Sequence, residues 1–168
     1  VQGAGLLGIY ACAMLRERGV EHVFCTDPVP QRRVLAQRFG AEPMPCDTDS
    51  AAERRDRIRE ASSHGVDAVL ELSGDRTALP EGVEHLRVGG VYLLAGMVHP
   101  DSDLGGVTGE QIIRKCLTLR GVHNYSPHHL DEALAFLTRT VDRYPYLSLV
   151  SEPLPLAELD RAIALAET

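Results

Sequence analysis

The sequence predicts an α/β domain built on a doubly wound, six-stranded parallel sheet with helices on both faces. Two observations support this prediction. Short apolar runs alternate with amphipathic stretches at intervals of about 20–30 residues, as in chained βαβ units, and a glycine-rich turn stands at the start of the chain. Because parallel strands need crossover helices that cover their sheet, a doubly wound sheet is the most economical architecture for this order of elements.

The first predicted strand is short, because only Val1 and Gln2 precede the glycine-rich turn. A strand in this position normally has its full length, so we expect the sequence to be a piece of a longer protein. The other apolar runs predict strands at residues 23–25, 42–44, 68–72, 91–95 and 117–121.

Helical spacing of apolar residues predicts helices between these strands. They span residues 6–18, 28–39, 50–63, 77–86, 109–115 and 156–166, and a further helix begins at Ser126-Pro127. The start at Ser126 is clear because a hydroxyl cap precedes a proline that needs no amide hydrogen. On that helix we expect a buried stripe of Leu130, Ala133, Leu134, Phe136 and Leu137. A short extended segment is expected at residues 147–150.

The size and composition of the chain place residues 1–168 in one globular domain. The net charge of −7 argues against nucleic acid and anionic membranes as partners, and no apolar run approaches the ~20 residues that span a bilayer. The four cysteines are far apart and form no C-x-x-C pair. We interpret Cys12 and Cys25 as core thiols in a reducing compartment, which favours the cytoplasm.

The opening run Gly3-Ala4-Gly5-Leu6-Leu7-Gly8 has the pattern G-x-G-x-x-G, and Asp27 follows its last glycine by 19 positions. This pairing is typical of a Rossmann-type dinucleotide-binding turn. Gly3 allows the tight turn, Gly5 lets the backbone approach a pyrophosphate, and Gly8 lets the helix lie close to the sheet. Amide groups at the start of the helix would then hold the phosphates.

Asp27 ends the second predicted strand, where a carboxylate can accept hydrogen bonds from both hydroxyls of an adenosine ribose. The same carboxylate repels a 2′-phosphate, so the sequence favours NAD over NADP. Arg32 and Arg33 keep NADP open as an alternative, because a nearby guanidinium can bind that phosphate. A tight turn without any ligand fits this surrounding pattern less well.

Further motifs follow along nearly the whole chain. They are Asp27 with Arg32, Phe39-Gly40-Ala41, residues 67–74, residues 86–90 with Gly96, Arg114-Lys115 and residues 117–121. With the glycine turn, they resemble the nucleotide-binding domain of the medium-chain dehydrogenase/reductase family, the zinc-type alcohol dehydrogenases. Residues 121–127 are most similar to a subgroup associated with phosphonate catabolism, and sorbitol- and threonine-dehydrogenase-like members are close alternatives.

The resemblance implies a set of cofactor-binding residues. By this resemblance, the pyrophosphate of NAD would lie against Gly3, Ala4, Gly5, Leu6, Leu7 and Gly8. Asp27 and Arg32 would bind the adenosine ribose, and Ser73 and Gly74 would line the cleft. The nicotinamide carboxamide would be held by backbone groups at Gly96, Met97, Val122, His123 and Asn124.

The resemblance also implies an enzyme that transfers a hydride between a small alcohol or aldehyde and NAD, with a catalytic zinc. In such enzymes the zinc ligands, the proton relay and most of the substrate pocket belong to a separate N-terminal domain, which is absent from these residues. We therefore assign no catalytic or metal-binding residue here, and expect this segment to hold NAD without catalysing hydride transfer by itself.

Three other functions stay open at this stage. A zinc-free quinone or enoyl reductase of the same superfamily would more often prefer NADP and lack an acid at position 27. A methyltransferase that uses S-adenosylmethionine would share the glycine-rich turn, but usually ends its sheet with a reversed hairpin strand that this sequence does not show. The third alternative is a regulatory domain that holds an unreactive nucleotide.

Several other polar groups have plain structural interpretations. The adjacent His128 and His129 point about 100° apart on a helix, which is poor geometry for one metal. Glu71 lies within an apolar strand, so we expect its carboxylate to be paired, and the charges of residues 53–60 predict a solvated helix face. We expect Tyr92 near a sheet edge.

Residues 117–119 form an apolar strand that we also expect near that edge. A long exposed edge would invite uncontrolled pairing, and by the family resemblance two such domains often pair edge to edge. We therefore expect a homodimer or a higher oligomer.

Overall fold

A parallel sheet forms the centre of the computed structural model, which describes residues 1–46 and 50–166. The strands in this part of the chain are β1 (Phe24–Thr26), β2 (Glu42–Met44), β3 (Val66–Glu71), β4 (Leu86–Leu94) and β5 (Thr118–Gly121). β1 pairs with β2, and β4 lies between β3 and β5. All of these pairings are parallel, as predicted.

Gln2 joins the two halves of this sheet. It forms isolated parallel bridges to Thr26 on one side and to Glu71 on the other. The spatial order is therefore β2, β1, Gln2, β3, β4, β5. The predicted six strands are five in the described residues, because the two residues before the glycine turn are enough for one bridge and too few for a strand.

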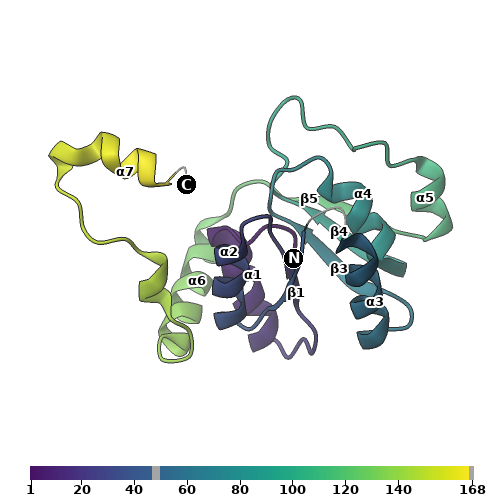
Figure 1. Ribbon diagram of the computed structural model, residues 1–168, viewed down its shortest axis with the longest axis horizontal. Helices are drawn as coiled ribbons and strands as arrows, with labels where there is room; N and C mark the ends of the chain where they lie inside the picture. Colours follow the sequence, from purple (N-terminus) through teal and green to yellow (C-terminus); the bar gives the residue numbers. More distant parts are fainter. Residues whose placement is uncertain (47–49, 167–168) are drawn as a thin grey trace.

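The helices cover both faces of the sheet, which confirms the doubly wound arrangement (Figure 1). α1 (Leu6–Glu17), α2 (Pro30–Arg38) and α6 (Pro127–Thr140) lie on one side, and α3 (Ala51–Ala61) and α4 (Ala78–His85) lie on the other. The remaining helical elements are α5 (Gly109–Arg114), the 3₁₀ helices η2 (Tyr146–Leu149) and η3 (Leu156–Glu158), and α7 (Leu159–Ala166).

The expected extended segment at residues 147–150 is wrong, since η2 occupies most of it. Both the amide and the hydroxyl of Ser148 donate to the carbonyl of Pro145, at 2.9 and 2.7 Å. This local pairing closes a 3₁₀ turn where the apolar sequence suggests a strand.

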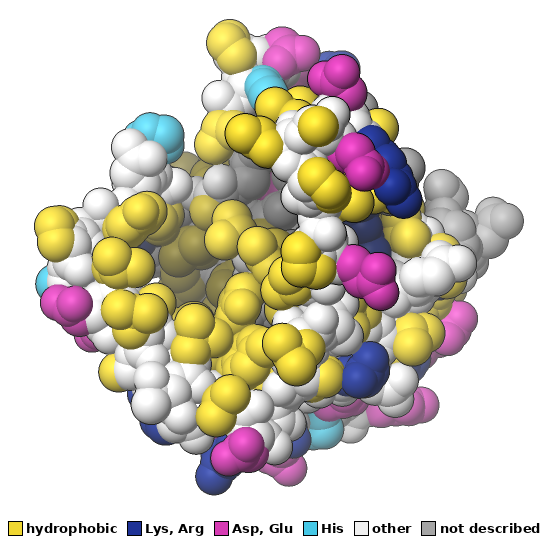
Figure 2. Space-filling model, turned by 90° about the vertical axis from the view of Figure 1, so that its left-hand side faces the viewer, with side chains coloured by type: hydrophobic (Ala, Val, Ile, Leu, Met, Phe, Trp, Pro, Cys, Tyr) yellow, Lys and Arg dark blue, Asp and Glu magenta, His cyan; other side chains and the backbone are white. Residues whose placement is uncertain are grey.

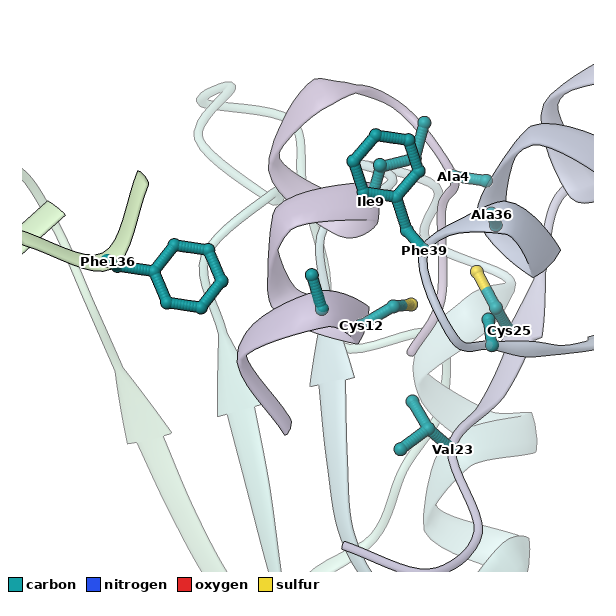
Figure 3. Close-up of a cluster of buried hydrophobic side chains, with 10 residues drawn as sticks. Ala4, Ile9, Cys12, Val23, Cys25, Ala36, Phe39 and Phe136 are labelled. Atoms are coloured by element: carbon teal, nitrogen blue, oxygen red, sulfur yellow. The ribbon is translucent and has the colours of Figure 1, made fainter. Parts of the chain in front are cut away.

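One core cluster lies between α1, β1 and α2 (Figure 3). Cys12, Cys25 and Phe39 are fully buried in it, and both cysteines are free thiols, which confirms their predicted place in the core. Burying the ring of Phe39 stabilises the fold by roughly 2–3 kcal/mol. The ring also stacks on Tyr144, with centroids 5.6 Å apart, so the segment after α6 is held against α1 and α2.

A second core cluster lies between α4 and strands β3 and β4, around the fully buried Tyr92. The hydroxyl of Tyr92 donates to Oε1 of Gln2 at 2.6 Å. The expectation that Tyr92 lies near a sheet edge is therefore wrong, because β4 is covered by β3 and β5. Within the described strands, β5 is the edge on this side.

The apolar stripe expected on α6 is only partly buried. Phe136 is buried and Leu137 is half-buried against the first cluster. Leu130 and Leu134 are 52% and 55% exposed, and Ala133 is exposed as well. Only the C-terminal half of α6 reaches α1, so the N-terminal half of the stripe stays uncovered. Figure 2 shows apolar side chains gathered around a hollow on this side of the molecule.

The charged face predicted at residues 53–60 is only partly solvated. Arg54 is buried, and it donates to Glu81 on α4 and to the carbonyl of Pro45, the latter at 3.0 Å. Arg57 donates to the carbonyl of Pro43 at 2.9 Å. Two arginine side chains of α3 therefore hold this helix against α4 and the end of β2.

Lys115 caps the C-terminal end of α4. Its ammonium group donates to the carbonyls of Val83, Glu84 and Leu86 at 2.8, 2.8 and 2.9 Å, and burial lowers its pKa. We predict that Lys115→Met lowers the free energy of unfolding by about 1–2 kcal/mol, because these carbonyls lose a charged donor. Urea denaturation measures this. The control is Arg114→Met, whose side chain is 79% exposed; equal stability of the two variants would contradict the prediction.

Candidate functional site

The glycine turn between Gln2 and α1 has the geometry that its sequence predicts. Gly3 has φ +96°, and a Cβ there would lie 2.9 Å from the amide nitrogen of Ser73. A Cβ on Gly8 would lie 1.8 Å from the carbonyl oxygen of Gly3, so Gly8 is required by the turn itself rather than by the sheet. In front of Gly5, by contrast, the described residues leave at least 4 Å of open space.

The start of α1 presents amide groups to that space. The first bond of the helix runs from the amide of Ile9 to the carbonyl of Gly5 at 3.0 Å, so the amides of Leu6, Leu7 and Gly8 come before it. Helix-start amides of this kind are not paired within the helix and carry the positive end of its dipole. The arrangement suits a bound phosphate.

Asp27 points toward the glycine turn from the end of β1. Its Oδ2 accepts from the amide of Ala4 and its Oδ1 from the amide of Val29, both at 2.8 Å. The residue is only 4% exposed. A carboxylate oxygen has two acceptor sites, so each oxygen keeps capacity for one further donor. This is the relation between acid and turn that the sequence predicts.

Arg33 is a neighbour of Asp27, and the sequence left it, with Arg32, as a candidate for binding the 2′-phosphate of NADP. Its guanidinium donates to the carbonyls of Asp27 and Pro28, so it holds the loop between β1 and α2. Arg32, the predicted ribose contact, lies half-buried in the first turn of α2. Its role remains a prediction. The sequence did not indicate which of the two adjacent arginines contacts the loop.

The turns after β3 and β4 meet at the same end of the sheet. A Cβ on Gly96 would lie 2.6 Å from the amide nitrogen of Gly74, and Gly74 has φ +75°. Because Gly3 also abuts Ser73, the turns at Gly3, Ser73-Gly74 and Gly96 form one continuous rim of backbone. Ligands of open α/β sheets bind at this carboxyl end of the strands.

Glu71 holds two of these turns together. It is fully buried, and its carboxylate accepts from the amide and hydroxyl of Ser73 and from the amides of Gly74 and Gly96, at distances of 2.7–3.1 Å. This confirms the expectation that Glu71 is paired. The partners are three backbone amides of the rim and the hydroxyl of Ser73, which the position of Glu71 in an apolar strand does not reveal.

The remaining predicted residues lie at the ends of β4 and β5. Met97 packs against the second core cluster, and the amide of Val122 donates to the carbonyl of Leu94 at 2.9 Å. His123 and Asn124 follow on an exposed loop, with Asn124 at φ +59°. The structure thus brings Met97 and Val122 to the rim, and leaves the cofactor contacts of all four residues as predictions.

The described residues do not bring together a metal site. No group of three or more His, Cys, Asp or Glu side chains in them could hold a metal ion. His129 is used locally, since its Nδ1 accepts from the amide of Ser126 at 3.0 Å and so caps α6. That His128 and His129 form no metal site stays a prediction.

Two cavities lie away from the rim. One of about 450 Å³ is lined by β1, β3 and α3, and one of about 720 Å³ by α3, α4 and α5. The candidate site is instead the open rim above the strands.

Among the described residues, none of the helices has the length and apolarity needed to cross a bilayer.

Comparison with known proteins adds relatives to this geometry. Residues 7–139 match the family model described as zinc-binding dehydrogenase. The 5-exo-hydroxycamphor dehydrogenase of Pseudomonas putida is 29% identical to this chain, and the match covers 99% of this chain and 46% of that relative. The L-threonine 3-dehydrogenase of Ruegeria pomeroyi is 33% identical, and that match covers 73% of this chain and 35% of the relative.

Solved structures agree with these matches. An alcohol dehydrogenase from Thermotoga maritima is 32% identical, with a TM-score of 0.89 over 99% of this chain and 46% of that one. The chain therefore spans about half the length of the relatives that it matches along its whole length. Because the family model covers more than half of its residues, the chain belongs to the zinc-binding dehydrogenase family.

Proposed function

We propose that this chain binds NAD on the rim above its strands, as the cofactor-binding part of an enzyme that oxidises a small alcohol. The observation that supports this most is the hydrogen bond between Asp27 and the amide of Ala4. It places a carboxylate beside a glycine turn whose helix amides face open space. A ribose acceptor and a phosphate site are thus next to each other, as a dinucleotide requires.

In this proposal the pyrophosphate lies against the amides of Leu6, Leu7 and Gly8, and the free acceptor sites of Asp27 bind the adenosine ribose. NAD is favoured over NADP because the carboxylate would repel a 2′-phosphate. The guanidinium of Arg33 already bonds two loop carbonyls. This supports the same choice, since leaving them for a phosphate would cost those bonds.

The nicotinamide half would extend over the ends of β3, β4 and β5. The predicted contacts there are Ser73, Gly74, Gly96, Met97, Val122, His123 and Asn124. When bound, NAD accepts the hydride, and the residues of this chain bind and orient it. Zinc in such an enzyme would be held outside the described residues, so we derive no step through it.

The relatives support an alcohol substrate, since their names include a hydroxycamphor and a threonine dehydrogenase. The phosphonate-associated subgroup and the cytoplasm remain predictions.

We also propose that the edge strand β5, with its exposed Thr118 and Arg120, pairs with a second copy, because an uncovered strand edge tends to associate.

The test is calorimetric titration of the chain with NAD and with NADP. We predict tighter binding of NAD, and a loss of about 10- to 100-fold in NAD affinity for Asp27→Ala, because a charged hydrogen bond contributes about 1.5–3 kcal/mol. The matched control is Asp67→Ala, since the Asp67 side chain is 84% exposed on β3 and contacts Arg87. A folded wild-type sample that binds neither cofactor would refute the proposal.

A further inference from the structure

We propose that Glu71 is a positioning residue that sets the pocket for the nicotinamide half of the cofactor. The inference rests on the proposed NAD site and adds to it a residue that would not touch the ligand. Glu71 ends β3, directly below the Ser73-Gly74 turn. Its carboxylate is fully buried, so it acts only through the groups that it holds.

All the hydrogen bonds to this carboxylate described above come from the rim. Oε1 accepts from the amide of Ser73 at 2.7 Å, from the hydroxyl of Ser73 at 2.8 Å and from the amide of Gly74 at 2.7 Å. Oε2 accepts from the amide of Gly96 at 3.1 Å. One side chain therefore joins the turn after β3 to the turn after β4.

The joined turns leave no room for a side chain at Gly96. A Cβ on Gly96 would lie 2.6 Å from the amide nitrogen of Gly74 and 2.9 Å from Oε1 of Glu71. The amide of Gly96 also donates to the main-chain carbonyl of Glu71 at 3.0 Å. The carboxylate thus fixes the height of both turns above the sheet, and with it the backbone groups predicted to hold the carboxamide.

A buried carboxylate is a costly way to hold a turn, because it must leave water. An apolar residue at the end of β3 would avoid that cost, but it would leave the amides of Ser73 and Gly74 without this acceptor. Glu71 orders backbone donors beside the proposed ligand site. Residues that hold the groups in contact with a ligand keep such a site pre-organised.

The adenosine half of the site has an attachment of its own, although Gly3 also abuts Ser73. The glycine turn is attached to β1, since the amide of Gly3 donates to the carbonyl of Thr26 at 2.8 Å and the amide of Ala4 donates to Asp27. In the order of the sheet, Glu71 and Gly96 lie on the other side of Gln2. Loss of the carboxylate should therefore affect one half of the dinucleotide and spare the other.

The experiment compares NAD with ADP, which lacks the nicotinamide half. Glu71→Gln keeps the shape of the side chain but turns an amide NH₂ toward donors. We expect this variant to lose about tenfold in NAD affinity while its ADP affinity stays within about twofold. The matched control is Glu81→Gln, which alters a partly buried acid on α4 away from the rim and should leave both affinities unchanged.

The outcomes separate the two proposals. Wild-type protein that binds neither NAD nor ADP refutes the NAD site itself. Wild-type protein that binds both, with Glu71→Gln losing both equally or neither, overturns the role of Glu71 alone. If Glu71→Gln does not fold, Glu71→Asp takes its place with the same titrations. Amide hydrogen exchange should then quicken at Ser73, Gly74 and Gly96, and unchanged exchange there would count against the inference.

Discussion

Replacing Gly8 with alanine should prevent the glycine turn from forming. The added Cβ would lie 1.8 Å from the carbonyl oxygen of Gly3, and this oxygen belongs to the backbone, so it cannot move aside without changing the turn. We expect the free energy of unfolding to fall by about 3 kcal/mol or more. Thermal and urea denaturation measure this, and NAD binding should be lost with the turn. A variant as stable as the wild type would show that the turn has another geometry.

Gly5→Ala is the matched variant, because it makes the same change three residues earlier in the same turn. The described residues leave 4 Å free around its Cβ, so stability should stay within about 0.5 kcal/mol of the wild type. The new methyl group would instead enter the space proposed for the pyrophosphate. We expect a loss of at least about tenfold in NAD affinity. Unchanged affinity would mean that the phosphates do not bind beside Gly5.

Replacing Arg54 with methionine should cause the second large loss of stability. The Arg54 side chain is 5% exposed and joins α3 to α4 through Glu81. The substitution takes a charged partner from the partly buried carboxylate of Glu81, which keeps His85, and a donor from the carbonyl of Pro45, which we expect to cost about 2–3 kcal/mol. Arg55→Met is the control, because Arg55 and its partner Glu84 are both largely exposed and such pairs contribute less than about 1 kcal/mol. Equal losses in a urea melt would contradict the argument.

The carboxyl group of Glu81, with its partners His85 and Arg54, predicts that the stability of the fold depends on pH. A hydrogen bond from His85, and next one from Arg54, hold the pKa of Glu81 below its ordinary value of 4.5. A lowered pKa in the folded state means that the stabilisation is present above about pH 4.5 and disappears as the pH falls through the folded value. The stability gap between wild type and Glu81→Gln should therefore be widest near neutral pH and close in acid. A gap that stays constant down to pH 3 would exclude this origin.

The alternatives left open by the sequence are now reduced. The described strands pair only in parallel, whereas a methyltransferase usually ends its sheet with a reversed hairpin strand. The family match points the same way. A zinc-free reductase of the superfamily and a regulatory nucleotide-binding domain differ from the proposed function in chemistry rather than in fold, and the NAD and NADP titrations address that chemistry.

Local sequence patterns predicted most elements of the fold, with the exceptions of the first strand and residues 147–150, and they predicted that Asp27 lies beside the glycine turn. The alternation of strands and helices and the turn Gly3 to Gly8 depend on spacing that is visible within a few residues. The distance to Asp27 is a second local signal, because a turn, a helix and a strand have nearly constant lengths in this motif.

Only the tertiary structure determined which charged and apolar side chains are buried, because burial depends on partners that are distant in the sequence. The sequence predicted that Glu71 is paired but not which groups pair with it, and it placed Arg54 on a solvated face. Both are buried because partners far along the chain, Gly96 and Glu81, contact them. Tyr92 and the stripe on α6 were misjudged for the same reason, since burial depends on which neighbour covers a face. A sequence period states which side of a helix is apolar, but only the packed chain determines whether anything lies against it.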